Sequence, residues 1–505
     1  MSSSDEEERR PRQPALSFIT PNGKQTNSLW ITANYEPSVA FDTSGTHAAI
    51  ASLIMEVGLA FFNSLSGLKF HVMYEPTKCV SYYASSKGMR VEEYQELLDR
   101  GWRRGKDGIE LKYLFRSGSL YYKQNLKRSC CPHYTIRLDP IPFKPRKDQR
   151  LAMNRWNKFV LGQSYIRSAA RLCPKTREEK KLRKTKFDLL QRVHEVEYTN
   201  VKRPRDPKTK RPIEPAHRFD VNIESDSFSQ AKYDLFLKYQ MQIHNEPASR
   251  WNVHSFKRFL CTGINRKVVK EGSKEQRLGS YHQCYRLDGK LIAVAVLDLL
   301  LHAVSSVYLF YDPEYSEYEF GKLSALREIA LTIEGNYQYY YMGFYIHSCQ
   351  KMRYKANFQP QYVLDPESLT WDPFDAYKEE LDRRPYVSLS HDRTLGGTTQ
   401  PGGNVEGQPT STAIKRSNIQ PQVNEEDMSL FDIHMPGVLT LQEVQEQVDL
   451  DHWKLLAHGV LVDMVDLVPW DNSDIRQPQS IKGIVGELAA VLGPKVVKNS
   501  VVVLF

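Results

Sequence analysis

The adjacent cysteines Cys130 and Cys131 are the residues of this chain best suited to metal chemistry. Neighbouring cysteines cannot join to each other in a disulfide without severe backbone strain. Lys127 and Arg128 precede the pair, and nearby positive charge favours the thiolate, which is the form of cysteine that binds metal. The pair therefore predicts half of a zinc or iron–sulfur site. The alternative is two buried cysteines with an apolar role.

A carboxylate near the end of an apolar run is a second candidate for chemistry. Residues 291–299 (LIAVAVLDL) predict a central strand that is buried on both faces. Asp298 is the one charged residue of this run. We expect its carboxylate to lie at the mouth of the sheet and to bind a cationic amine or guanidinium group. The alternative is that Asp298 only caps the following turn.

The preceding strand, predicted over 278–287, carries three more polar candidates. Side chains alternate between the two faces of a strand, so Tyr281 and Gln283 share one face and His282 lies on the other. His282 is a candidate general base, with a hydrogen-bonded structural role as the alternative. Gln283 joins the candidate catalytic residues, and Tyr281 joins the candidate substrate-binding residues.

Three cations follow the last predicted strand of this region, which ends at Ile346. Lys351, Arg353 and Lys355 alternate along the chain. A guanidinium can hold a carboxylate or a sulfonate through two parallel hydrogen bonds. We therefore expect these three residues to bind an acidic group of a substrate. The alternative is an ordinary basic edge segment that faces water.

Positive charge is concentrated in one segment of the chain. Residues 171–211 contain 15 lysines and arginines against 6 acidic residues, and this excess equals the net charge of +9 of the whole chain. Such a segment suits a polyanion such as RNA, with a solvated helix and linker as the alternative. Gly321–Lys322 opens a predicted helix, and helix N-termini bind phosphate. The residues expected to contact nucleic acid are Arg103, Arg104, Lys180, Lys184 and Lys322.

The order of predicted elements over 278–346 indicates how these side chains are positioned. A strand, an Asp-Gly turn, two strands, a helix over 321–333 and a further strand follow one another. This order matches acyltransferases in which a curved sheet opens around the acyl donor, and it predicts an α+β fold. A chain of 505 residues is too long for one core, so we expect further domains.

Longer strings of sequence resemble the arginyl-tRNA–protein transferase family. Residues 97–104 (LLDRGWRR) and 121–137 (YYKQNLKRSCCPHYTIR) are similar to the family's N-terminal domain. Residues 279–299 (GSYHQCYRLDGKLIAVAVLDL) and 340–355 (YYMGFYIHSCQKMRYK) are similar to its catalytic domain. The tail from Met435 onward resembles an extension carried by filamentous-fungal members.

The resemblance implies an enzyme that joins arginine from charged tRNA to proteins beginning with Asp, Glu or oxidised Cys. The product is a signal for ubiquitin-dependent degradation. The resemblance also implies a GNAT-like catalytic domain whose acyl donor is aminoacyl-tRNA in place of coenzyme A. No cofactor is required for the transfer itself, because the ester of a charged tRNA is already activated. The implied partners are arginyl-tRNA and the acidic N-termini of substrate proteins.

The resemblance also divides the chain into six segments. They are a disordered N-terminus (1–16), a cysteine-bearing N-terminal domain (17–150), a basic helical and linker region (151–215), a GNAT-like catalytic domain (216–390), a disordered linker (391–430) and a C-terminal extension (431–505). The scattered cysteines and the acidic N-terminus suggest no secreted disulfide framework, no signal peptide and no membrane association. The compartment expected is the cytoplasm, with the nucleus as the alternative.

Two departures from the family pattern affect the cysteine site. In the family a CxxC motif joins the Cys-Cys pair to hold an iron–sulfur cluster or zinc, but here Cys79 is followed three residues later by Tyr82. Four thiolates therefore cannot be assembled from this region alone. Residues 28–77 and 106–116 have no counterpart in the family. We interpret both as inserts that arose from unspliced introns or a misplaced exon boundary.

Two rival functions follow from the same sequence. A coenzyme A-dependent N-acetyltransferase would need a glycine-rich diphosphate loop before the helix at 321–333, and residues 319–322 (EFGK) do not supply one. A catalytically impaired tRNA-binding homologue is favoured by the atypical N-terminal domain. Arginyl transfer is the function that we expect.

Overall fold

The computed structural model describes residues 16–19, 29–33, 81–86, 89–105, 119–271, 274–396, 429–457 and 460–504. Cys79 and the predicted insert at 106–116 lie outside these ranges, as do most of the predicted insert at 28–77 and most of the predicted disordered segments. Within the described residues, the helices are all too short or too polar to traverse a lipid bilayer.

A nine-stranded sheet forms the centre of the molecule, and we call it the central sheet. Its order is β14-β13-β6-β12-β11-β10-β9-β7, with β8 paired to β9. The strands are β6 (Tyr134–Leu138), β7 (Phe219–Ser225), β8 (Lys267–Glu271), β9 (Lys274–Leu287), β10 (Lys290–Leu299), β11 (Ala303–Tyr311), β12 (Tyr339–Tyr345), β13 (Gln361–Leu364) and β14 (Trp371–Pro373). The mixture of sheet and helix confirms the predicted α+β class.

The most apolar strand lies where its sequence predicts. Residues 292–299 of β10 are at most 1% exposed, because β9 and β11 flank the strand and helices cover both faces of the sheet. The turn from β9 to β10 contains Asp288 at φ 52° and Gly289 at φ 83°. These left-handed angles are the ones that an Asp-Gly hairpin turn requires, which confirms the predicted hairpin.

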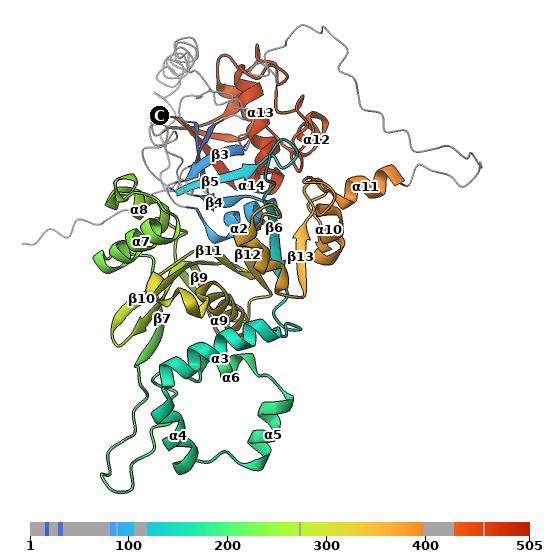
Figure 1. Cartoon of the computed structure of the whole chain (residues 1–505). Helices are drawn as coiled ribbons and strands as arrows, with labels where there is room; N and C mark the ends of the chain where they lie inside the picture. The colour runs from blue at the N-terminus through green and yellow to red at the C-terminus, as the bar shows by residue number, and fades with distance from the viewer. Residues whose placement is uncertain are drawn as a thin grey trace, which may run out of the picture.

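Helices cover both faces of the central sheet (Figure 1). On one face α7 (Gln230–Ile243) packs against β10 and β11, and α8 (Val253–Leu260) joins it in one aromatic cluster. On the other face α9 (Phe320–Glu334) packs against β11 and β12, and α3 (Lys147–Leu161) covers α9. The remaining helical elements of the central region are η2 (Ala248–Arg250), η3 (Pro313–Tyr318), η4 (Gln350–Asn357), α10 (Phe374–Leu381) and α11 (Leu389–Gly396).

A second sheet unites the two ends of the chain. Its order is β16-β15-β17-β2-β1-β3-β5-β4, and the antiparallel pairing of β17 with β2 joins the C-terminal strands to the N-terminal ones (Figure 1). The strands are β1 (Leu16–Ile19), β2 (Leu29–Ala33), β3 (Ser81–Ser86), β4 (Arg103–Gly105), β5 (Ser119–Gln124), β15 (Lys454–Ala457), β16 (Val460–Asp463) and β17 (Ser500–Leu504). The associated helices are α2 (Val91–Asp99), α12 (Leu441–Gln447), η6 (Met464–Asp466), α13 (Ile481–Leu492) and α14 (Pro494–Lys498).

The N-terminal region predicted to end at residue 150 contributes a strand to the central sheet. Strand β6 lies inside the central sheet, between β12 and β13, although it was assigned to the N-terminal domain. The short sequence YTIRL gives no indication of its partners, which lie about 200 residues further along the chain. The chain therefore leaves the second sheet after β5 and enters the central sheet with β6.

The basic region forms a layer of short helices beyond α3. They are α4 (Gln163–Leu172), α5 (Arg177–Thr185) and α6 (Leu189–His194). This region was expected to be helical, and the structure shows that α5 ends at Thr185. Asp188 begins a new helix there, because its side chain accepts a hydrogen bond from the backbone N–H of Gln191.

Candidate active site

Strands β11 and β12 lie side by side at one end only. Ala303–Ser305 pair in parallel with Tyr339–Tyr341, and no later residues of these strands pair with each other. Strand β12 is also irregular against β6 between Tyr341 and Phe344, where Gly343 has φ 78°. The two strands therefore separate beyond Ser305 and Tyr341. We call the residues that gather there the divergence point.

A row of polar side chains crosses the central sheet beside the divergence point. Ser280 of β9 lies opposite Asp298 of β10, Asp298 opposite Ser305 of β11, and Ser305 opposite Tyr341 of β12. Because paired residues project from the same face, these four side chains line up on the face that α7 and α8 cover. Polar side chains that are buried in such a row require hydrogen-bond partners from another element.

The segment from Asp99 to Arg104 supplies those partners. The Tyr341 hydroxyl donates to Asp99 Oδ1 at 2.5 Å. Nη1 of Arg103 donates to Ser305 Oγ at 3.2 Å, and the guanidinium of Arg104 donates to both carboxylate oxygens of Asp298, at 2.8 and 3.3 Å. The motif LLDRGWRR thus binds the central sheet directly, which sequence reasoning did not predict.

The structure pairs two of the predicted site residues, Asp298 and Arg104, with each other. Both are buried, and Asp298 also accepts a hydrogen bond from Ser280. Burial alone would lower the pKa of Arg104, but the Asp298 carboxylate raises it overall. The carboxylate of Asp298 and the guanidinium of Arg104 therefore neutralise each other inside the protein. The run LIAVAVLDL shows that Asp298 is buried, but the identity of its partner depends on the tertiary fold.

Arg103 is buried beside Arg104 but lacks its compensation. The residue is 5% exposed, and Nε and Nη2 have no hydrogen-bond partner among the residues that the structure describes. The guanidinium lies 5.5 Å from the ring centre of Tyr341 and 5.6 Å from that of Phe344. Burial lowers the pKa of Arg103. Its side chain points into the divergence point, and its contact with tRNA stays a prediction.

Lys355 brings a second cation to the same place. Its ammonium group is enclosed and donates to the backbone carbonyls of Met342 and Phe344, at 2.8 and 2.9 Å. Burial and then the proximity of Arg103 lower its pKa to about 8. Lys355 therefore holds the irregular part of β12 in place and adds positive charge next to Arg103.

A buried carboxyl group approaches from the opposite face. Glu328 of α9 is 1% exposed and accepts hydrogen bonds from Ser324 and from the Tyr340 hydroxyl, the latter at 2.6 Å. Burial raises the pKa of Glu328, despite the hydrogen bonds and the nearby charge of Lys355 that lower it. Burial therefore opposes the charged form of Glu328, while the positive charge of Lys355 favours it. Sequence reasoning missed Glu328, which lies in an ordinary helical pattern.

The polar residues predicted on β9 have mainly structural surroundings. His282 is fully buried with Nε2 at 2.8 Å from the carbonyl oxygen of Leu260, and burial lowers its pKa to about 3. It is therefore neutral and enclosed, which favours the alternative of a hydrogen-bonded structural role over a general base. Gln283 lies on the opposite face, as predicted, and accepts a hydrogen bond from Tyr285 at 2.7 Å. Tyr281 shares that face and is 9% exposed.

The three cations after β12 do not share one face. These residues lie on the helical turn η4, where positions two apart do not share a face. Lys351 and Arg353 are exposed, and Arg353 donates to the carbonyl of His347 at 3.1 Å. Lys355 alone turns toward the divergence point.

Lys322 is at the start of a helix, as predicted, but it is already paired. Its ammonium lies 2.6 Å from Glu319 and 3.2 Å from Asp148. These two carboxylates reduce its capacity to bind phosphate. A contact with a terminal phosphate would require the lysine to leave both of them.

The cysteine pair offers two ligands of a metal site. Cys130 is exposed, Cys131 is partly exposed, and their sulfur atoms lie 3.6 Å apart. Among the residues that the structure describes, no three His, Cys, Asp or Glu side chains are grouped so as to hold a metal ion. Cys79 lies outside those residues. Two thiols do not complete a zinc or iron–sulfur site, because such a site needs four ligands.

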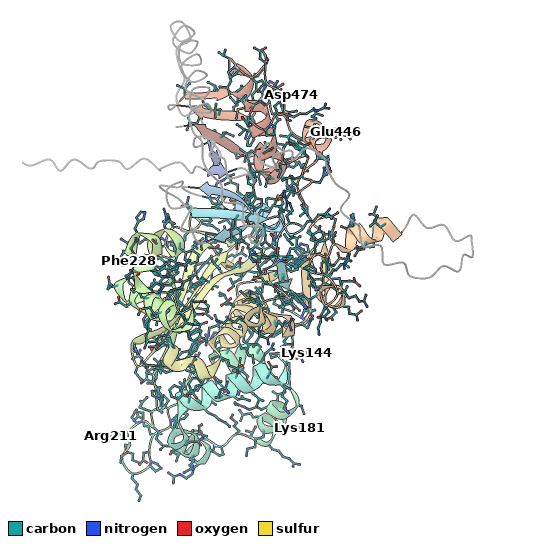
Figure 2. All side chains as sticks on the ribbon, turned by 45° about the horizontal axis from the view of Figure 1, so that its top comes forward. Lys144, Lys181, Arg211, Phe228, Glu446 and Asp474 are labelled. Atoms are coloured by element: carbon teal, nitrogen blue, oxygen red, sulfur yellow. The ribbon has the colours of Figure 1, made fainter. Side chains whose placement is uncertain are left out.

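The basic layer presents its charge to solvent. Lys180 is exposed, whereas the side chain of Lys184 lies outside the described part of the chain. Arg183 is paired with Glu195 at 2.9 Å. Figure 2 shows Lys181 and Arg211 at the end of the molecule remote from Asp474. The exposed lysines and arginines of this layer are Arg171, Lys175, Arg177, Lys180, Lys181, Arg183, Lys186, Lys202, Arg203, Arg205, Lys208, Lys210 and Arg211.

Comparison with known proteins gives concordant matches. The family model described as "Arginine-tRNA-protein transferase, C terminus" matches residues 231–365, and the corresponding N-terminus model matches residues 112–151. "Arginyl-tRNA--protein transferase 1" of Saccharomyces cerevisiae is 29% identical over 434 residues, which cover 79% of this chain and 77% of the relative. The protein of the same name from Arabidopsis thaliana is 26% identical over 466 residues, covering 62% and 72%. That from Drosophila melanogaster is 28% identical over 396 residues, covering 59% and 79%.

Among solved structures, the C-terminal domain of a putative lysylphosphatidylglycerol synthetase from Agrobacterium fabrum gives a TM-score of 0.22 at 10% identity. The match covers 66% of this chain and 72% of that domain. A score this low carries no argument about the fold.

Proposed function

The chain belongs to the arginyl-tRNA–protein transferase family, and from this premise we propose that it transfers arginine from arginyl-tRNA to proteins whose N-terminal residue is acidic. The acceptors are proteins that begin with Asp, Glu or oxidised Cys. Arginylated proteins of this kind are marked for ubiquitin-dependent degradation. The cytoplasm is the compartment that this function suggests, with the nucleus as the alternative.

One observation in the structure supports this proposal above the others. Arg103 and Lys355 place two enclosed cations at the point where β11 and β12 separate, and Arg103 keeps two N–H groups unused. Parallel strands that separate are also the hallmark of GNAT-like acyltransferases, so we assign the catalytic part of the chain to that architecture. The acyl donor would then lie at the divergence point.

The reaction needs no nucleophile from the enzyme, because the ester of the charged tRNA is already activated. The neutral α-amine of the acceptor attacks the ester carbonyl, the new C–N bond forms, and the ribose hydroxyl of tRNA leaves as the C–O bond breaks. The α-ammonium loses its proton before attack, and its usual pKa of about 7.7–8.0 makes this step easy near neutral pH. Positioning of both substrates then supplies much of the rate enhancement.

The basic layer of α4, α5 and the loop over 202–211 is proposed to hold the tRNA. Its exposed cations are placed to neutralise phosphates, and most of them have no carboxylate partner among the described residues. Lys351 and Arg353, exposed next to Lys355, are proposed to contact the acceptor polypeptide. No cofactor takes part in the transfer step.

A transfer assay tests this function. Purified protein is incubated with arginyl-tRNA that carries radiolabelled arginine and with a peptide that begins with Asp. We expect label in the peptide, and we expect none when the peptide is N-acetylated or when ribonuclease destroys the tRNA. Acetyl coenzyme A with the same peptide should give no product. Acetylation of the peptide, or no incorporation of arginine by folded protein, would refute the proposal.

A further inference from the structure

We infer that the C-terminal extension (431–505) positions the segment Asp99–Arg104 for arginine transfer, through contacts with Trp102 and Arg100. This inference rests on the proposed function and gives the extension a part in that reaction. Trp102 and Arg100 are positioning residues, since they act on the divergence point through the residues that follow them in the segment.

The indole of Trp102 completes the end of a helix in the extension. Trp102 is fully buried, and its Nε1 donates a hydrogen bond to the carbonyl oxygen of Val491 at 3.3 Å. Val491 belongs to the last turn of α13, where the backbone carbonyls have no partner within the helix. The two preceding carbonyls, of Ala489 and Ala490, accept hydrogen bonds from backbone N–H groups of the extension itself. The carbonyl of Val491 has instead a donor that lies 389 residues earlier in the chain.

The guanidinium of Arg100 packs against the turn that follows α13. A Cβ atom at Gly493 would lie 2.7 Å from Cζ and 2.8 Å from Nε and Nη1 of Arg100. Gly493 also has φ 84°, which residues with a side chain rarely adopt. The backbone carbonyl of Arg100 accepts a hydrogen bond from Lys123, and a Cβ atom at Gly437 would lie 3.3 Å from the Nζ of that lysine. The extension therefore approaches the segment and its lysine closely at two glycines.

Helix α2, which leads into the segment, also contacts the extension. Helix α14 packs against α2, and the ammonium of Lys495 on α14 lies 3.3 Å from the carboxylate of Glu96 on α2. The backbone N–H groups of Arg100 and Trp102 both donate to the carbonyl of Leu97, so the segment turns directly away from the end of α2. The packing of α2 against the extension therefore determines where the segment starts.

The same segment reaches the divergence point on its other side. Arg103 donates a hydrogen bond to Ser305, and Arg104 donates to Asp298. Trp102 and Arg103 are adjacent, and a trans peptide bond holds their Cα atoms about 3.8 Å apart, so a shift of the indole also moves the guanidinium. A displacement of about 1 Å at a reacting site can lower the rate about 100-fold. We therefore expect the extension to affect the rate of transfer through this segment.

Two tryptophans that form similar hydrogen bonds provide a matched test. Trp453 is 4% exposed and donates through Nε1 to the carbonyl of Ser500 at 3.1 Å, but both of these residues lie within the extension. Trp102→Phe and Trp453→Phe each remove one buried hydrogen bond and keep an aromatic ring, so we expect similar decreases in melting temperature. We expect kcat to fall about 10-fold in Trp102→Phe and less than about 2-fold in Trp453→Phe. The KM for arginyl-tRNA should change in neither, because the basic layer lies at the end of the molecule remote from α13 (Figure 1).

Two glycines at similar helix junctions provide a second matched test. Gly493 joins α13 to α14 at φ 84° and ψ 160°, and Gly162 joins α3 to α4 at φ 74° and ψ 150°. A Cβ atom at Gly493 would meet the guanidinium of Arg100, and one at Gly162 would lie 2.5 Å from the Cβ of Ala216. Alanine introduces similar backbone strain at both positions, but it displaces Arg100 only at Gly493. At saturating arginyl-tRNA we expect kcat to fall about 10-fold in Gly493→Ala but not in Gly162→Ala, and to recover in part when Arg100→Ala is added to Gly493→Ala.

Hydrogen exchange at the amides of residues 99–105 provides a readout that needs no transfer. We expect faster exchange there in Trp102→Phe and Gly493→Ala, and wild-type rates in Trp453→Phe and Gly162→Ala. Equal kcat within each pair of folded variants would overturn the inference, whatever their stability, because the extension would then have no effect on transfer. If the wild type transfers no arginine, faster exchange confined to Trp102→Phe and Gly493→Ala would keep the positioning role and refute the proposed function.

Discussion

Replacement of Asp298 by alanine should reduce arginine transfer by destabilising the folded protein, without any direct effect on the reacting groups. Asp298 is fully buried and compensates the guanidinium of Arg104 through contacts at 2.8 and 3.3 Å. The pair joins β4 of the second sheet to β10 of the central sheet. Removal of one partner of a buried ion pair costs about 3–5 kcal/mol, since the other charge stays buried without compensation. Typical folded proteins are stable by only about 5–15 kcal/mol, so the loss is a large fraction of the total.

Urea denaturation followed by fluorescence measures this effect, and the variant is compared with a double variant. Arg104→Met combined with Asp298→Leu removes both charges and fills the space with apolar side chains. Because no uncompensated charge remains, we expect the double variant to regain most of the lost stability and some transfer activity. The reasoning would be refuted if Asp298→Ala were as stable as the wild type but inactive. That result would restore Asp298 as a residue that contacts substrate.

Three further predictions concern other parts of the chain. Hydrogen bonds to Glu197 and then Glu334 raise the pKa of His194 to about 9, so its stabilising contribution is fully present below its unfolded pKa of about 6.5 and is lost as the pH rises through 9. The loss of stability in His194→Gln, measured by denaturation across pH, should therefore be largest near pH 6 and vanish near pH 10. Lys180→Glu should raise the KM for arginyl-tRNA and reduce the slope of log KM against log salt by about one, with no change in the KM for the peptide. Replacement of Cys130 and Cys131 by serine should lower the iron or zinc content measured by mass spectrometry, and equal metal content in the variant would exclude the pair as ligands.

The elements of the central sheet could be predicted because each has a strong local pattern. The runs at 278–287 and 291–299 with the Asp-Gly turn between them define β9 and β10, and α9 begins within one residue of its expected start. The order of these elements also gave the fold class. Strand β6 and the pairing of β17 with β2 could not be predicted, because short strands carry no information on distant partners.

The candidate site was only partly predictable, for a physical reason. Lys355 was chosen for its charge, and the structure does place it at the divergence point, but through a helical turn and not through an alternating strand. Asp298 and His282 were chosen because polar groups in an apolar strand are often functional. Such groups are equally well explained by a buried partner, and the structure supplies one for each. Sequence alone cannot distinguish these cases, since the partners come from segments far away in the chain.

The same limit explains why Arg103 and Arg104 cannot be separated by sequence. They are adjacent, identical and equally buried, and both reach the polar row that runs across the central sheet. What differs is the residue opposite each of them, which is Asp298 for Arg104 and Ser305 for Arg103. Since Asp298 and Ser305 are themselves paired across β10 and β11, the two arginines contact neighbouring positions on one face of the sheet. The carboxylate of Asp298 forms an ion pair with Arg104, which makes Arg104 a structural residue. The hydroxyl of Ser305 is neutral, so it does not neutralise the positive charge of Arg103. A carboxylate added at the second position with the first retained, Ser305→Asp, should therefore satisfy Arg103 within the protein while Arg104 keeps its own counter-charge.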